Sequence, residues 1–194
     1  MKAVFHKPFA EPDAGGLRDV PGDILRDPGR TVKARAEAAK AARRLCLAAR
    51  DSGVPILVLS SFRSVAAQSA LYIDAERRHG RGRGALWVAP PGWSEHHTGL
   101  AFDLADASRP ETDDEPSFEE TAAFRWLKDR AGEFGFEMSF PKGNWQGVGY
   151  EPWHWRFAGT EDAGKIFHPP FWRKAGVLLK SICYGIGLAA RNLS

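Results

Sequence analysis

The chain has 194 residues, 43% of them hydrophobic, so it can bury one sizeable core as a single globular domain. Its 27 lysines and arginines are dispersed among 24 acidic residues, and the resulting net charge of +3 gives no support for nucleic-acid binding. Cys46 and Cys183 lack the paired spacing of a thiolate zinc site, so a metal in this chain would need nitrogen and oxygen ligands.

The two ends of the chain are unlike its middle. Met1–Gly16 has no apolar run, so we expect neither a signal peptide nor a membrane span there. Ala175–Ala190 is apolar but short, and Lys180 and several glycines interrupt it, which argues against a spanning helix. We therefore expect an N-terminal extension at residues 1–30, a folded domain at 31–172 and an apolar C-terminal tail at 173–194, in a monomeric protein.

The first part of the central domain predicts a strand between two helices. Thr31–Arg50 places small and apolar residues at helical spacing. Ile56–Leu59 is a short apolar run bounded by turn signals, which indicates a buried strand. Ser64 can cap a second helix that runs to His79 and ends at Gly80.

A loop and a second strand follow. The segment Gly80–Gly92 is rich in Gly, Arg and Pro and is predicted to be a loop. Leu100–Leu104 alternates, so Leu100, Phe102 and Leu104 should face the core while Ala101 and Asp103 face the other way. The acidic stretch Asp106–Pro116 has no periodicity and is expected to lie at the surface.

The last part of the domain predicts one helix and two strands. Ser117 and Glu120 form a capping box for a helix that continues through Ala131 and ends at Gly132. The aromatic and Met side chains of residues 134–140 alternate as a strand, and His154–Phe157 forms another. The element order predicts an α+β fold in which helices cover a small, mainly antiparallel sheet.

Three side chains form a candidate metal site. A glycine-containing turn can bring His96 close to the strand residue Asp103, and His154 follows the carboxylate of Glu151 by three residues. Catalytic zinc sites use three such nitrogen and oxygen ligands and leave one position for water. Glu151 could then act as the general base towards that water. His97 could replace His96 if the turn were shifted by one residue.

The residues around these candidates resemble a known family. Ser94–Asp103 resembles the S-x-H-x-x-G-x-A-x-D signature of the VanY-type D-alanyl-D-alanine carboxypeptidases, and Glu151–His154 resembles their E-x-W-H. Ser60–Ser64, followed by Gln68, is similar to their S-G-Y-R-S-x-x-x-Q element. The three segments occur in the order of the family, and together they are specific although each alone is weak.

The resemblance implies a role for each matching residue. His96, Asp103 and His154 would bind one zinc ion, and Glu151 would be the catalytic base. Arg63 would hold the substrate or the developing oxyanion, because a guanidinium binds such groups through paired donors. Further lining residues are expected at Gln68, Ser94 and Trp153. The implied fold is that of the hedgehog and D-Ala-D-Ala peptidase group, and the implied reaction removes the terminal D-alanine of peptidoglycan stem peptides.

The chain departs from the family pattern at three positions, which leaves substrate preference open. Phe62 stands where tyrosine is common, His97 where glutamine is common, and Ser139 where an arginine often stands. An L,D-carboxypeptidase, a phage-type endopeptidase and a non-catalytic zinc-containing binding module like the hedgehog signalling domain are the alternatives. Retention of Glu151 and Arg63 argues against the last of these. The substrate implies the periplasm or cell wall, whereas no signal peptide is found here, so a cytoplasmic or phage-encoded protein is the other possibility.

Overall fold

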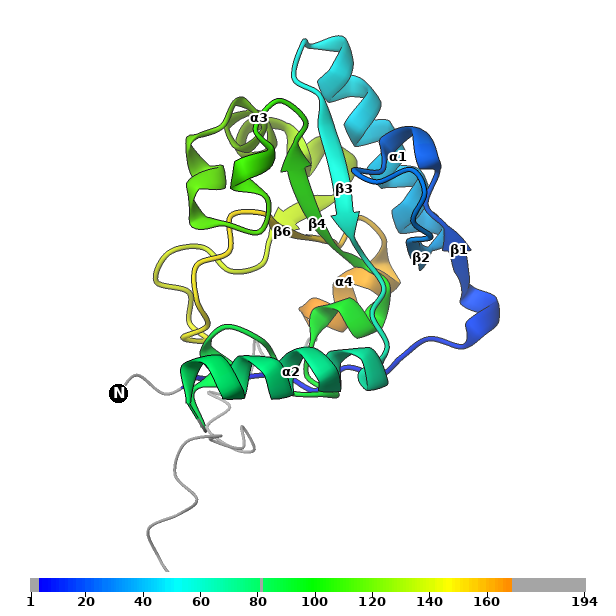
Figure 1. The fold of residues 1–194 in the computed structure, drawn as a ribbon. Coiled ribbons are helices and arrows are strands. Elements are labelled where there is room, and N and C mark those ends of the chain that lie inside the picture. Colours follow the sequence, from blue (N-terminus) through cyan, green and yellow to red (C-terminus); the bar gives the residue numbers. More distant parts are fainter. Residues whose placement is uncertain (1–3, 81, 169–194) are drawn as a thin grey trace, which may run out of the picture.

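Four antiparallel strands form the central sheet of the protein, whose computed structural model describes residues 4–80 and 82–168 (Figure 1). In spatial order the strands are β3 (Ile56–Ser60), β4 (Ala101–Asp106), β6 (His154–Phe157) and β5 (Phe136–Met138). Helices lie around this sheet, so the predicted α+β architecture with a small antiparallel sheet is confirmed.

The helices meet the sheet in different ways. Helix α1 (Ala36–Asp51) and helix α3 (Ala122–Arg130) contribute buried residues to the core, whereas α2 (Val65–His79) lies across one end of the strands (Figure 1). The α2 boundaries are those predicted: the Ser64 hydroxyl accepts a hydrogen bond of 3.1 Å from the amide of Ala67, and Gly80 follows the last residue.

The core lies on one side of strand β4. Leu100, Phe102 and Leu104 belong to one buried apolar cluster, which includes residues of α1 and α3. Asp103 points to the opposite face, where it is also buried. The predicted alternation is therefore confirmed, because successive side chains of a strand point to opposite faces.

The N-terminal part forms a small second sheet that the sequence did not indicate. Strand β1 (Leu17–Asp19) pairs antiparallel with β2 (Lys33–Arg35), so the first helix begins at Ala36 and the predicted start at Thr31 is wrong. Three residues of the expected extension, Val20, Ile24 and Leu25, are buried in the core. The domain boundaries at residues 30 and 172 stay predictions.

The third helix begins later than the capping box predicted. Residues Pro116–Glu120 form a short 3₁₀ helix, and Thr121 caps α3 by accepting a hydrogen bond of 3.1 Å from the amide of Phe124. Ser117 therefore does not cap a helix. The physical reason is the burial of Phe118, which the tighter 3₁₀ turn directs into the core. The helix also ends in a further 3₁₀ turn, Ala131–Phe134, which the left-handed Gly135 closes in place of Gly132.

The remaining elements complete the sheet and one edge of the domain. Phe134 lies in that 3₁₀ turn and Phe140 follows the strand, so β5 is shorter than the predicted strand over residues 134–140. Helix α4 (Glu161–Phe167) was not predicted. The expected tail at residues 173–194 lies outside the described residues. Among the helices that the structure describes, none combines the length and apolar character that a membrane crossing requires.

Candidate metal centre and active site

The register of the sheet places three polar residues in one row across adjacent strands. Asp103 on β4 is the direct partner of His154 on β6 and of Ser60 at the end of β3. Directly opposed residues of antiparallel strands have side chains about 5 Å apart, close enough to share a ligand or a hydrogen bond. Ser60 Oγ donates a hydrogen bond of 2.5 Å to Asp103 Oδ2, which fixes the carboxylate. The sheet therefore brings together residues that are far apart in sequence.

His96 enters the site from a 3₁₀ turn, Glu95–Thr98, directly before β4. Ser94 caps this turn, because its hydroxyl accepts a hydrogen bond of 3.3 Å from the amide of His96. Gly99 ends the turn with a φ of 67°, and a Cβ there would lie 2.9 Å from a methyl group of Leu17. Only glycine meets both conditions without strain. The turn thus holds His96 over the start of β4.

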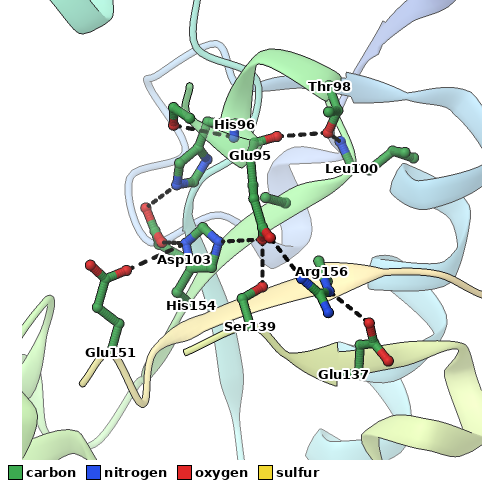
Figure 2. Close-up of polar contacts among 12 residues, drawn as sticks. Glu95, His96, Thr98, Leu100, Asp103, Glu137, Ser139, Glu151, His154 and Arg156 are labelled. Atoms are coloured by element: carbon green, nitrogen blue, oxygen red, sulfur yellow. Dashed lines mark hydrogen bonds and ion pairs between the residues drawn. The ribbon is translucent and has the colours of Figure 1, made fainter. Parts of the chain in front are cut away.

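His96, Asp103 and His154 form a buried cluster in which one ligand atom of each lies within 4.8 Å of the others. His96 Nε2 is 3.2 Å from Asp103 Oδ2, and His154 Nδ1 is 3.1 Å from Asp103 Oδ1 (Figure 2). Ligand atoms on a tetrahedral zinc ion with bonds of about 2.1 Å lie roughly 3.4 Å apart. The donor types and their spacing therefore fit zinc.

The remaining nitrogen of each ring has its own partner. His96 Nδ1 is 2.7 Å from the carbonyl oxygen of Ser61, and His154 Nε2 is 3.1 Å from Glu95 Oε2. Both partners accept hydrogen bonds, so they hold the rings with His96 Nε2 and His154 Nδ1 directed at Asp103. His97 is fully buried elsewhere: its ring lies 2.7 Å from the Arg63 carbonyl and accepts a bond of 3.0 Å from the amide of Gly92. His97 is therefore not part of the ligand cluster.

The pKa values of the three clustered side chains are all shifted from their ordinary values. Burial alone would lower the pKa of His154, but hydrogen bonds to Asp103 and Glu95 outweigh it and raise that pKa to about 10. Burial likewise opposes ionisation of Asp103, yet the nearby histidines hold its pKa well below the ordinary value. For His96, burial dominates and lowers the pKa. The cluster thus pairs a protonated His154 with an ionised Asp103, and a bound cation would take the place of the proton on His154 Nδ1.

Glu151 lies beside the cluster without belonging to it. Its Oε2 is 3.9 Å from His154 Nδ1, and its side chain is 18% exposed (Figure 2). Burial raises the pKa of Glu151 to about 7; the charge of His154 opposes this shift, while that of Asp103 adds to it. A carboxylate whose pKa lies near neutrality, with access to solvent, has the properties of a general base.

Arg63 approaches the cluster from the segment between β3 and α2. Its Nη2 is 3.7 Å from Asp103 Oδ2, and its Nη1 donates a bond of 3.1 Å to Gln68 Oε1. Gln68 is 1% exposed and also donates to the carbonyl of Ala89 at 2.8 Å, so it holds the guanidinium in place. Trp153, in contrast, is half-buried and packs against the hydrophobic core.

Glu95 and Arg156 belong to the site although no sequence motif indicated a role for either of them. The Glu95 side chain is 3% exposed, and it contacts His154, Ser139 and Arg156 (Figure 2). Burial opposes ionisation of Glu95, but the hydrogen bond from His154 and the charge of Arg156 outweigh it and lower the pKa to about 2. The available signal was an acidic residue directly before a candidate ligand, which without the fold indicates only a solvated turn.

Two imidazoles and a carboxylate around one point, with an unligated carboxylate beside them, define the class of metal-dependent hydrolase sites. Comparison with known proteins agrees. The sequence profile of the VanY family, described as D-alanyl-D-alanine carboxypeptidase, matches residues 31–160. The chain belongs to this family, and the resemblance found in its motifs is confirmed.

Relatives and solved structures support the same assignment. The chain is 33% identical over 132 residues to a D-alanyl-D-alanine carboxypeptidase of Enterococcus faecalis, covering 62% of this chain and 47% of the relative. The L,D-carboxypeptidase LdcB has a TM-score of 0.71 at 30% identity, covering 84% of this chain and 78% of that one. A VanY D,D-pentapeptidase solved in complex with Zn(II) has a TM-score of 0.62 at 26% identity, covering 85% and 92%. The chain spans about half the length of the curated relatives it matches.

Proposed function

We propose that this chain is a zinc-dependent carboxypeptidase that hydrolyses the terminal D-alanine of peptidoglycan stem peptides. One observation carries the proposal: three buried side chains each offer one ligand atom within 4.8 Å of the other two, and the carboxylate of Glu151 lies next to them. The ligands would be His96, Asp103 and His154, which would hold one zinc ion. A zinc ion held in this way acidifies water and polarises a carbonyl group.

Glu151 would supply the proton transfer. Its raised pKa, about 7 in the metal-free protein, keeps the carboxylate a useful proton acceptor close to neutral pH. After the water has attacked the scissile carbonyl, the same carboxyl group would donate this proton to the amide nitrogen as the C–N bond breaks. The terminal residue then leaves as free D-alanine. The distance of 3.9 Å between its Oε2 and His154 Nδ1 supports this role, because the carboxylate lies close to the cluster.

Arg63 would bind the anionic part of the substrate. Its guanidinium is part-buried at the edge of the cluster, where it would pair with the terminal carboxylate or with the developing oxyanion. The contact with Gln68 supports this proposal, because Gln68 Oε1 accepts a hydrogen bond from Arg63 Nη1 and so fixes the guanidinium. Ser94 and Trp153 would contribute indirectly, through the turn that carries His96 and through packing beside His154.

The decisive experiment compares the wild type with Glu151→Gln. We expect the variant to keep stoichiometric zinc but to release D-alanine from a pentapeptide about 10²- to 10⁴-fold more slowly, because a general base contributes that much. The matched control is Glu161→Gln, the same chemical change at a side chain that is 83% exposed. Equal D-alanine release by wild type and Glu151→Gln would refute the assignment of the base.

An L,D-carboxypeptidase is the second candidate, favoured by the likeness to LdcB. Incubating the protein separately with pentapeptide, tetrapeptide and cross-linked stems and weighing the products separates these activities. Loss of D-alanine from the pentapeptide alone supports the first proposal, and loss from the tetrapeptide alone supports the second. Cleavage inside a cross-linked stem would indicate an endopeptidase, and zinc binding without any cleavage would indicate a binding module. We also propose that the protein is a monomer, which light scattering after gel filtration tests.

A further inference from the structure

We propose that Glu95 is a positioning residue of the metal centre: its carboxylate fixes the His154 ring so that Nδ1, and not Nε2, binds the metal. This inference rests on the proposed zinc site. Glu95 is neither one of the proposed ligands nor the proposed base. The proposal explains why Glu95 is buried in an ion pair with Arg156 next to the ligands.

The hydrogen-bond partners of His154 determine which ring nitrogen carries the proton. Nε2 lies 3.1 Å from Glu95 Oε2, and Nδ1 lies 3.1 Å from Asp103 Oδ1. An ionised carboxylate only accepts hydrogen bonds, so the nitrogen that faces Glu95 must donate. Nδ1 faces the carboxylate of Asp103 in the same way, so a metal ion shared with Asp103 would take the place of the Nδ1 proton, while the Nε2 proton stays in its hydrogen bond to Glu95.

Glu95 can impose this orientation because its own position is fixed. Oε1 accepts a bond of 2.7 Å from Arg156 Nη1, and Oε2 accepts a bond of 2.5 Å from Ser139 Oγ (Figure 2). Both carboxylate oxygens of Glu95 therefore accept hydrogen bonds, and the side chain is only 3% exposed. Arg156 is held from its other side by Glu137 at 2.6 Å, across the β5–β6 pair.

The other histidine shows what Glu95 adds. His96 Nδ1 lies 2.7 Å from the backbone carbonyl of Ser61, so the main chain sets its orientation. His154 depends instead on the side chain of Glu95, whose carboxylate also accepts a hydrogen bond from Ser139 Oγ. Ser139 adds a hydrogen bond to Glu95 without adding a charge. A single side-chain substitution can therefore remove the outer hydrogen bond of His154, whereas the outer hydrogen bond of His96 is made by the main chain.

The test uses Glu95→Gln, with Glu137→Gln as the matched control. Both variants remove one carboxylate from Arg156, but only the first changes the partner of His154. Zinc affinity is measured by competition with a chromophoric chelator, the Co²⁺-substituted proteins are compared by visible absorption, and thermal unfolding of the metal-free proteins reports on the fold.

We expect Glu95→Gln to weaken zinc binding about 10- to 100-fold and to alter the Co²⁺ spectrum, as substitution of outer partners of metal-binding histidines does. Glu137→Gln should bind zinc within about threefold of the wild type, since no contact joins it to a ligand. A folded Glu95→Gln protein with wild-type zinc affinity and spectrum would overturn the proposal. Equal weakening in both variants would also overturn it, because the effect would then come from Arg156. A wild type that binds no zinc would instead refute the proposed function.

A measurement on the wild type keeps the proposal testable if Glu95→Gln does not fold. Long-range ¹H–¹⁵N correlation of the zinc-loaded protein identifies the protonated nitrogen of each ring. We expect the proton on Nε2 of His154 and on Nδ1 of His96. A proton on Nδ1 of His154, with Nε2 bound to the metal, would contradict the role assigned to Glu95.

Discussion

The two faces of strand β4 perform different tasks although their residues alternate along one short segment. Phe102 is fully buried in the apolar cluster and makes an edge-to-face contact with Phe136 at 5.6 Å between ring centroids. Asp103, the next residue, lies in the polar cluster with both histidines. Because successive side chains of a strand point to opposite faces, one residue can contribute to the stability of the core while the next contributes to the polar site. Substitutions on the two faces should therefore affect different measured quantities.

Phe102→Ala tests the apolar face and should have the largest effect on stability. Removing a fully buried phenylalanine from a core costs about 3–5 kcal/mol of the free energy of unfolding, through lost transfer energy and the cavity that remains. Urea unfolding of the metal-free protein measures this loss. Zinc affinity per folded molecule should stay close to that of the wild type at low temperature. A stability loss below about 1 kcal/mol would contradict the separation of the faces.

Asp103→Asn tests the polar face of the same strand. We expect zinc affinity to fall by more than about 100-fold, because even partners outside the ligand set cost 10- to 100-fold. The loss of stability of the metal-free protein should be smaller than that of Phe102→Ala, since no apolar volume is removed. Chelator competition and urea unfolding give the two quantities. The idea fails if Asp103→Asn is the more destabilising substitution.

The pH dependence of metal-free stability sharpens the comparison, because only the polar face titrates. The pKa of Glu95 is about 2 in the folded state against an ordinary 4.5, so its stabilisation is present above pH 4.5 and is lost as the pH falls towards 2. The pKa of His154 is about 10 against 6.5, so its stabilisation is complete below pH 6.5 and is lost as the pH rises to 10. We expect the network to stabilise the fold most between pH 4.5 and pH 6.5, with roughly 3 kcal/mol of this coming from Glu95.

Thermal unfolding across the pH range, with chelator present, measures this profile. Glu95→Gln should remove much of the acid-side decline that the wild type shows. An identical acid limb in both proteins would mean that other carboxylates, and not this network, control the transition.

Gly99→Ala has the smallest expected effect and tests the turn that carries His96 to the polar face. At a φ of 67° the new Cβ would also meet Leu17 at 2.9 Å and the Arg35 amide at 3.2 Å. We expect a loss of about 1–3 kcal/mol together with weaker zinc binding. Gly53→Ala is the control, since Gly53 has a similar φ of 77° with nothing within 4 Å. Equal losses at both sites would show that backbone strain alone, and not the contact with Leu17, accounts for the effect.

Patterns that are local in sequence predicted much of this protein. The capped helix from Ser64, the alternation of Leu100–Leu104 and the last strand are present as expected, because each depends on neighbouring residues. The three candidate ligands also come together in one cluster. Their spacing and residue types contained enough information to propose zinc, and the motifs around them pointed to the family.

Other features depended on contacts between distant segments, and the tertiary structure alone decided them. The pairing of Leu17–Asp19 with Lys33–Arg35 shortened the first helix, and the burial of Phe118 moved the start of α3 to Ala122, with Thr121 as its cap. Glu95 contacts His154 only because the sheet register sets His154 opposite Asp103, close to the turn that contains Glu95. A sequence shows that a carboxylate precedes a histidine, but hydrogen bonds act over about 3 Å, and only the folded sheet determines which partners lie within that distance.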